Sequence, residues 1–352
     1  MNEEVITLEY LARKAGVSHS TVSRALADSP LVNAETKARI QKLALEFGFE
    51  LNQVARNLKV RATKMIGLVV PEVSNPFYPE LVQQVADHSR NAGFTLQLQL
   101  SGRNQELESA CVGSLSGSRA DGILIVTGEH GLVARSQVNA LVAAGKPVVV
   151  MGWVEDADHF DLVAGDDAAG GRSLAAHLVA LGHVRIAVLG KAAHRGAFDR
   201  MVGFREELAV RGFPLHPELN IVVKNENDVR SGVAKLLGLS APPTAIFAYQ
   251  DSLAATVYRQ VQQSGLSIPN DISVVGFDNL DLATYLSPRL TTVGTHITPL
   301  CSAFVSLLVR RIQGIDPELP PQTIVITPKI IVRESSNSPR SHALLRSKPR
   351  AS

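Results

Sequence analysis

The sequence predicts a small all-helical head followed by a larger α/β body, and two patterns support this division. Between residues 7 and 64, apolar residues recur at helical spacing, and a glycine separates two short helical stretches. From Met65 onward, short apolar runs alternate with amphipathic stretches, which is typical of parallel sheets covered by helices on both faces. A chain of 352 residues, 45% of them hydrophobic, should form two or three compact units.

Charge and cysteine content narrow the class of protein. The net charge is +2; residues 1–64 hold ten Lys/Arg and seven acids, which gives 10 − 7 = +3 and leaves −1 for the rest. Cys111 and Cys301 form no metal-binding spacing, so we expect no metal or cofactor and a reducing, cytoplasmic setting. The start of the sequence lacks a signal-peptide pattern, and no apolar run is long enough to predict a membrane partner.

The head has the helix signals of a helix-turn-helix. Thr7 and Ser18 are predicted to cap its first two helices, with Gly16 at the turn between them. Val22 and Leu26 should face inward, which leaves an outward face that could be merely solvated. That face consists of His19, Ser20, Ser23 and Arg24. Asn33 should cap a third helix with apolar residues Ile40, Leu43, Ala44 and Phe47 and an end at Gly48.

The sequence resembles the LacI/GalR family of bacterial regulators. The resemblance rests on the motif from Ile6 to Leu26, with AGVS at 15–18 and TVSRAL at 21–26. The resemblance implies that His19, Ser20 and Arg24 contact base edges while Thr21 and Ser23 hold phosphates, chemistry that suits these side chains. The full set of DNA contacts that it implies is Thr7, Ser18, His19, Ser20, Thr21, Ser23, Arg24, Asn33, Asn52, Val54, Ala55, Leu58 and Lys59.

Residues 52–60 match the family's hinge helix, which folds when two subunits meet on DNA. A helix of about two turns is marginal alone, because isolated helices usually need roughly 12–15 residues. Leu58 corresponds to the leucine that the family wedges into the minor groove. The alternative is a plain linker with Leu58 packed on the core. Leu51 replaces the family's usual proline, so the hinge should be less preorganised when free.

The body should contain two doubly wound lobes. Strands are predicted at 66–70, 95–99, 122–126 and 147–151, and again at 185–189, 221–223, 244–248 and 272–277. The resemblance implies a type I periplasmic-binding-protein-like effector domain, with crossovers near 162–165, 291–295 and 322–325. The predicted division is a head at 1–50, a hinge at 51–64, an N-lobe at about 65–163 and 295–323, a C-lobe at about 164–294 and 324–334, and a disordered tail at 335–352.

Ligands of such sheets bind beyond the carboxyl ends of the strands. The aromatics after the first strand could be core residues, Trp153 could pack beneath a loop, and Asp166 could serve only as a helix cap. Arg200 and Asp278 could grip a ligand or form a structural ion pair. The resemblance favours the cleft, and the predicted effector contacts are Ser74, Asn75, Phe77, Tyr78, Trp153, Asp166, His194, Arg200, Asn227, Gln250, Asp278 and Thr295.

These features predict a homodimeric transcriptional repressor that binds a pseudo-palindromic operator in double-stranded DNA. A small molecule between the lobes should control it. The resemblance implies that Asn227 stands where purine-responsive members carry an aromatic residue and that Thr295-His296 replaces the family's usual glutamine. Both departures favour a hydroxyl-rich ligand over a stacked base, and His194 and Arg195 leave a sugar acid possible. The alternatives are a regulator with a nucleobase or other effector and a solute-binding protein. An enzyme is not expected, because the sequence shows no nucleophile–base pair, metal spacing or phosphate loop.

Overall fold

The computed structural model describes residues 6–26, 28–47, 49, 63–102, 104–127, 135–154, 157–190, 195–223, 226–294 and 297–339. The chain divides into two compact units, Met1–Thr63 and Lys64–Ser352. Most of the predicted hinge, including Leu51, Asn52 and Leu58, lies outside the described residues, as do Gly48, His194 and Thr295.

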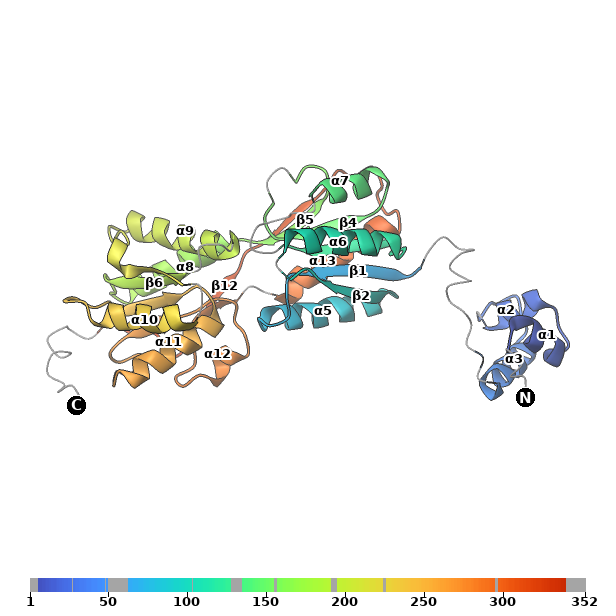
Figure 1. Cartoon of the computed structure of the whole chain (residues 1–352), viewed down its shortest axis with the longest axis horizontal. Coiled ribbons are helices and arrows are strands. Elements are labelled where there is room, and N and C mark those ends of the chain that lie inside the picture. Colours follow the sequence, from blue (N-terminus) through green and yellow to red (C-terminus); the bar gives the residue numbers. More distant parts are fainter. Residues whose placement is uncertain are drawn as a thin grey trace. The chain divides into compact units, whose positions relative to one another are not determined.

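The head is a three-helix unit, made of α1 (Leu8–Ala15), α2 (His19–Leu26) and α3 (Ala34–Glu46) (Figure 1). The Thr7 and Asn33 side chains accept hydrogen bonds from backbone amides of the helices they cap, and Ser18 accepts one from Thr21 N at 3.2 Å. Gly16 has a φ of 64°, a conformation that favours glycine, and ends α1 as predicted. The head's core includes Leu11, Val22, Ala25, Ile40 and Ala44.

The first lobe of the body, the N-lobe, contains a six-stranded parallel sheet in the order β11-β5-β4-β3-β1-β2. Its strands are β1 (Met65–Val70), β2 (Thr95–Leu100), β3 (Gly122–Val126), β4 (Val148–Met151), β5 (Asp161–Gly165) and β11 (Thr323–Ile326). Its helices are α5 (Phe77–Asn91), α6 (Gln105–Gly117), α7 (Arg135–Ala143) and α13 (Ile297–Ile312). Helices α5 and α13 share one core with the sheet, and α6 and α7 contribute to another (Figure 1). The sheet is therefore doubly wound.

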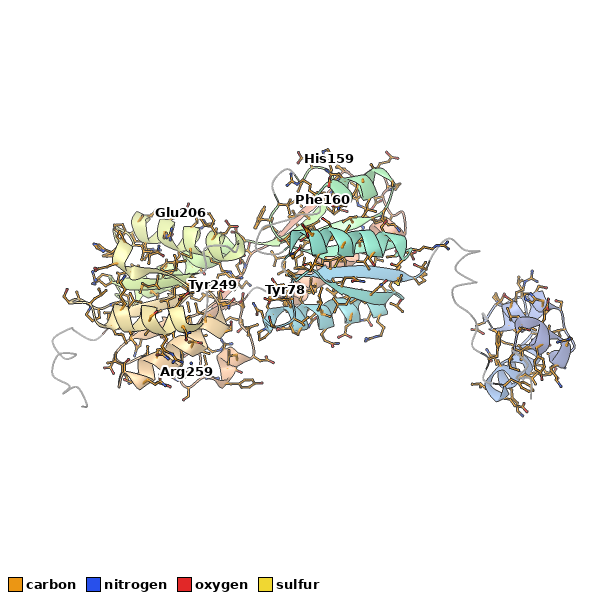
Figure 2. The ribbon with its side chains drawn as sticks, in the orientation of Figure 1. Tyr78, His159, Phe160, Glu206, Tyr249 and Arg259 are labelled. Carbon is orange, nitrogen blue, oxygen red and sulfur yellow. The ribbon has the colours of Figure 1, made fainter. Side chains whose placement is uncertain are left out.

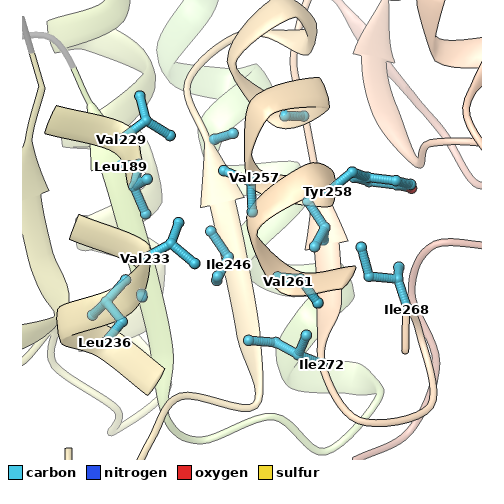
Figure 3. Packing of buried hydrophobic residues seen from close by; sticks show 14 of the residues in the cluster. Leu189, Val229, Val233, Leu236, Ile246, Val257, Tyr258, Val261, Ile268 and Ile272 are labelled. Atoms are coloured by element: carbon cyan, nitrogen blue, oxygen red, sulfur yellow. The ribbon is translucent and has the colours of Figure 1, made fainter. Parts of the chain in front are cut away.

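The second lobe, the C-lobe, contains a four-stranded parallel sheet in the order β7-β6-β8-β9. Its strands are β6 (Ile186–Gly190), β7 (Asn220–Val222), β8 (Ala245–Ala248) and β9 (Ser273–Val275). Its helices are α8 (Asp167–Ala180), α9 (Arg195–Val210), α10 (Glu226–Leu237), α11 (Asp251–Gln263), the short α12 (Leu282–Tyr285) and a 3₁₀ turn at Pro217–Leu219. Figure 3 shows side chains of α10 and α11 packing on one face of the sheet. Helices α8 and α9 pack on the other face.

All eight predicted strands are confirmed within two residues, and the chain crosses between the lobes at the predicted 291–295, but the other two predicted crossovers fall within strands. Residues 162–165 lie within β5, and residues 323–325 lie within β11, which pairs in parallel with β5. The N-lobe therefore extends to Gly165 and to Ile326, beyond the predicted limits of 163 and 323. The chain crosses after each of these strands and after β10 (Thr292–Gly294), which pairs antiparallel with β12 (Lys329–Ile331). Strands β5 and β11 are short, so their residues resemble connections in the sequence; of the two, only β11 lies at an edge of the sheet.

The prediction of a disordered tail from residue 335 is wrong for its first five residues. Ser335 is fully buried, and its backbone oxygen accepts a hydrogen bond from Val274 N at 3.0 Å. Asn337 N donates to Ser273 Oγ at 3.1 Å, so the segment continues the hydrogen bonding at the edge of β9. Its polar composition suggested disorder, but its backbone groups find partners in the sheet. Residues 340–352 lie outside the described part of the chain.

Candidate functional site

A cavity of about 130 Å³ lies between the two lobes, where the carboxyl ends of both sheets face one another. Figure 2 labels Tyr78 of the N-lobe and Tyr249 of the C-lobe, which line it from opposite sides. The lining residues are Asn75, Phe77, Tyr78, Val126, Thr127, Met151, Gly152, Trp153, Gly165, Asp167, Arg200, Tyr249, Gln250, Asp278, Leu300 and Pro328. This is the position at which doubly wound sheets bind ligands.

The N-lobe wall of the cavity is largely apolar and aromatic. The rings of Phe77 and Tyr78 meet edge to face with centroids 5.4 Å apart, at the start of α5. Asn75 Oδ1 accepts a hydrogen bond from Phe77 N at 3.1 Å, which fixes the turn that presents these rings. Trp153 is 37% exposed, and its Nε1 donates to Gly165 O at 2.9 Å. The indole is thus held at the rim with part of its surface open to a ligand.

The C-lobe wall is polar, and close packing of two helices builds it. A Cβ on Gly171 of α8 would lie 2.0 Å from Arg200 O, and one on Gly203 of α9 would lie 2.0 Å from Ala168 O. Only glycine allows the backbones of α8 and α9 to approach this closely. As a result, Asp167, the first residue of α8, lies beside the Arg200 side chain of α9.

Arg200 is held by two carboxylates and one carbonyl. Its Nε donates to Asp167 Oδ1 at 3.2 Å, its Nη2 lies 2.9 Å from Asp278 Oδ1, and its Nη1 donates to Tyr249 O at 2.9 Å. The guanidinium carbon also lies 3.8 Å from the centroid of the Phe277 ring. The Arg200 donors are therefore fixed in direction before any ligand arrives.

Burial and charge act in opposite directions on the pKa values of this cluster. Burial raises the pKa of Asp278 to about 6, although Arg200 opposes the shift. Burial likewise raises the pKa of Asp167 against the effect of Arg200. Burial disfavours charge on Arg200, but the two acids raise its pKa overall, so it stays protonated. Of the two roles left open for Arg200 and Asp278, the ion pair is present, and it lies on the surface of the cleft.

The structure brings seven of the predicted effector residues together in the cavity lining: Asn75, Phe77, Tyr78, Trp153, Arg200, Gln250 and Asp278. Ser74 and Asn227 are exposed and do not line it. Asp166 also does not line it, because its side chain caps α8 by accepting from Ala169 N at 2.8 Å. The next residue, Asp167, lines the cavity instead. Successive side chains at the start of a helix point about 100° apart, so Asp166 caps the helix while Asp167 faces the cavity.

The head presents the predicted reading face of α2. His19, Ser20 and Arg24 are exposed and Ser23 is half-buried, whereas Val22 and Ala25 pack inside. The predicted inward residue Leu26 is only partly buried. Ser18 Oγ lies 2.9 Å from Ser20 Oγ and 2.8 Å from Thr21 Oγ1, so these hydroxyls form one cluster at the helix start. A helix start rich in donors suits phosphate oxygens.

No helix in the described ranges combines the length and apolar character needed to cross a bilayer. Among the same residues, no group of three or more His, Cys, Asp or Glu side chains is arranged to hold a metal ion.

A helix-turn-helix head followed by a two-lobed domain with a cleft defines the class of ligand-controlled DNA-binding proteins. Comparison with known proteins agrees. Residues 7–52 match the model of bacterial regulatory proteins of the lacI family, and residues 175–336 match the periplasmic binding protein-like domain. The chain is 32% identical over 333 residues to the ribose operon repressor of Haemophilus influenzae, covering 94% of this chain and 98% of the repressor.

Solved structures give the same result. A LacI family transcriptional regulator from Enterococcus faecium with bound ribose is 29% identical, with a TM-score of 0.68 over 78% of this chain and 100% of that chain. The lac repressor dimer bound to operator is 23% identical and shares the fold, with a TM-score of 0.83 over 95% of this chain and 100% of that chain. The chain belongs to the lacI family of bacterial regulatory proteins, and it is a DNA-binding transcriptional regulator, not an enzyme.

Proposed function

We propose that this regulator is a homodimeric repressor of a carbohydrate-utilisation operon, released from its operator by a neutral sugar bound between the lobes. The observation that carries the proposal is the two-sided cleft, with an aromatic wall from the N-lobe and the Asp167–Arg200–Asp278 cluster from the C-lobe. A sugar has apolar ring faces and a belt of hydroxyls that both donate and accept, so it matches both walls.

The charges of the cleft favour a neutral sugar over a sugar acid. Arg200 is the only cation among the described lining residues, and two carboxylates already pair with it. With both acids ionised, this cluster sums to −1, and protonating one of them brings it only to neutrality. An anionic ligand would therefore have to displace an existing carboxylate from the guanidinium. The ribose operon repressor among the relatives supports the same choice.

Operator binding requires two copies of the head. A single α2 offers few base contacts, and a pseudo-palindrome is read by two helices related by a twofold axis. The edge strand β2 leaves Leu98 39% and Leu100 46% exposed, and an uncovered edge with apolar side chains favours pairing with another chain. This supports a dimer that forms through the N-lobe. Sugar binding would then favour one lobe arrangement over the other and change how the two heads are held.

The test is a gel-shift assay with DNA from upstream of the regulator's own gene and of the genes beside it, run with and without a panel of pentoses, hexoses, disaccharides, sugar acids and nucleobases. A thermal-shift screen of the same panel finds the ligand, because one present at about 100 times its dissociation constant adds about 2.7 kcal/mol of stability. We expect a neutral sugar to raise the melting temperature and release the DNA. Release by a sugar acid or a nucleobase alone would contradict the proposed effector, and failure to bind any such DNA at low salt would contradict operator binding.

A further inference from the structure

A buried acid lies directly behind the cleft without lining it. Asp251, the first residue of α11, is 0% exposed, whereas its neighbour Gln250 lines the cavity. The Asp251 carboxylate forms none of the salt bridges found among the described residues, although the charge of Arg200 acts to lower its pKa. The site also leaves it little room, since a Cβ on Gly276 would lie 2.2 Å from Asp251 Oδ1. A buried carboxylate is costly unless it is well hydrogen-bonded, so its partners indicate its role.

The first partner is the turn that carries Asp278. Asp251 Oδ2 accepts a hydrogen bond from Leu280 N at 2.8 Å, two residues beyond Asp278. Asp278 has a φ of 107° and Asn279 a φ of 54°, a backbone conformation that side-chain-bearing residues rarely adopt. Such strain persists only where the surroundings hold it. The Asp251 carboxylate closes this turn from below and so directs Asp278 toward Arg200.

The second partner is the strand from which the chain crosses between the lobes. Asp251 Oδ1 accepts from Thr292 Oγ1 at 2.6 Å, and Thr292 begins β10. The same hydroxyl oxygen accepts from Asn279 N at 3.4 Å, and Asp278 N donates to Val293 O at 2.9 Å. One carboxylate therefore joins the turn that carries the effector-facing acid to the strand that leads toward the N-lobe.

The electrostatic setting agrees with this arrangement. Burial, followed by the nearby Asp278 carboxylate, raises the pKa of Asp251 to about 8, although both of its hydrogen bonds lower it. An amide at this position is therefore a fair mimic of the acid, because it can still accept from Leu280 N while its NH2 donates to the Thr292 hydroxyl.

We infer that Asp251 is a positioning residue for effector binding: it holds Asp278 in the cleft and links it, through the Thr292 hydroxyl, to crossover strand β10. This inference rests on the proposed function, since it assigns a role behind the same cleft. The two hydrogen bonds of Asp251 have different roles. The bond from Leu280 N sets sugar affinity, and the bond from the Thr292 hydroxyl transmits the sugar-bound state toward the N-lobe.

Two matched pairs of variants test it, Asp251→Ala with Asp251→Asn, and Thr292→Val with Thr292→Ser. Binding of D-ribose is followed by the fluorescence of Trp153, the only tryptophan, which lines the cavity. We expect Asp251→Ala to weaken ribose binding about tenfold, because the buried Leu280 amide loses its acceptor, while Asp251→Asn stays near wild type. Operator affinity without sugar should not change in either variant.

The Thr292 pair tests the link to β10. Thr292→Val keeps the shape of the side chain but loses the hydroxyl. We expect it to keep ribose affinity while ribose-driven release of operator DNA falls about fivefold or more, a typical size for coupling between sites. Thr292→Ser should behave as wild type. Equal release by Thr292→Val and Thr292→Ser would overturn the link, and wild-type ribose affinity in Asp251→Ala would overturn the positioning role. This pair still decides the link if Asp251→Ala does not fold.

A measurement without sugar separates this inference from the proposed function. Amide hydrogen exchange of residues 278–280 should be at least about tenfold faster in Asp251→Ala than in Asp251→Asn, because the Leu280 amide loses its acceptor, while exchange in α5 should not change. Equal exchange in the two variants would overturn the inference. Wild-type protein that binds neither operator DNA nor any neutral sugar of the panel would instead contradict the proposed function, and the exchange result would still stand.

Discussion

Arg200 and Asp278 form an ion pair at 2.9 Å, and both side chains come from the C-lobe. Arg200 lies on α9, and Asp278 follows β9, so the pair is complete without any contribution from the N-lobe. The polar wall of the cleft is thus built within one lobe, and the other lobe supplies an aromatic wall. Preorganised donors and acceptors lower the cost of ordering side chains when a ligand binds.

Loss of this pair should separate effector response from operator binding. We expect Asp278→Asn to weaken sugar binding about 10–100-fold, because a hydrogen bond to a charged group contributes about 1.5–3 kcal/mol, and to leave operator affinity unchanged. Arg200→Ala should also destabilise the fold by about 3–5 kcal/mol, since it leaves the buried Asp278 carboxylate and the half-buried Asp167 carboxylate without their cation. Fluorescence titration and gel shift measure the two activities. Arg172→Ala is the control, because Arg172 makes only partly exposed ion pairs; a matching loss there would argue against the assignment.

The close approach of α8 and α9 can be tested with an added methyl group. Gly171→Ala places a carbon against Arg200 O, so we expect a loss of about 1–3 kcal/mol in unfolding free energy together with weaker sugar binding. The matched control is Gly113→Ala in α6, where nothing lies within 4 Å of the added carbon. That change should stabilise the protein by about 0.5–1 kcal/mol. Urea denaturation measures both, and equal effects would contradict the packing explanation.

The exposed face of α2 predicts that changes in the head affect operator binding without affecting sugar binding. Arg24→Ala should reduce affinity for the specific operator by about 1–3 kcal/mol, the usual value of a bidentate contact to a base, while sugar affinity stays unchanged. Lys42→Ala removes an exposed cation on α3 outside the predicted contact set and serves as the control. Fluorescence anisotropy against specific and scrambled DNA distinguishes lost readout from lost charge. Equal loss on both DNAs would assign Arg24 to the phosphates.

His183 should make stability depend on pH. Its ring is buried, with Nδ1 2.8 Å from Thr244 Oγ1 and Nε2 2.9 Å from Asn337 O, and burial lowers its pKa to about 4. The unfolded chain takes up the proton near pH 6.5 and the folded chain only near pH 4, so stability should fall as pH drops through this window. The full loss is about 3 kcal/mol at 1.36 kcal/mol per pKa unit. Urea denaturation of wild type and His183→Gln at pH 7.5 and 4.5 isolates the contribution of His183 to the pH dependence. An equal loss of unfolding free energy in the two proteins would contradict the prediction.

The segment after residue 334 should contribute to folding stability. Ser335 Oγ donates to Val274 O and accepts from Thr291 N at 2.8 Å, and both contacts are buried. We expect Ser335→Ala to cost about 1–3 kcal/mol, because it leaves the buried Thr291 amide without its acceptor. Ser338→Ala, at an exposed position of the same segment, is the control. Equal melting temperatures of Ser335→Ala and Ser338→Ala would show that the Ser335 hydroxyl does not contribute to stability.

The sequence by itself determined those parts of the fold that depend on local signals. Thr7, Gly16 and Asn33 fixed helix ends in the head through contacts within three or four residues. The alternation of apolar runs and amphipathic stretches located eight strands, because a buried parallel strand must be apolar on both faces. The family motif added the cleft residues, most of which the structure brings together.

The tertiary structure decided what depends on contacts between distant segments. Asp167 replaces Asp166 in the cleft because Gly171 and Gly203 let α8 and α9 touch, and no local pattern gives the spacing of two helices. The fully buried Ser335 completes the edge of β9 from about 60 residues away, although its own neighbourhood is polar. Asp251 is an acid in the first turn of α11, and only the tertiary fold places Leu280 and Thr292 against it. In each case a long-range hydrogen bond or close packing outweighed the local preference.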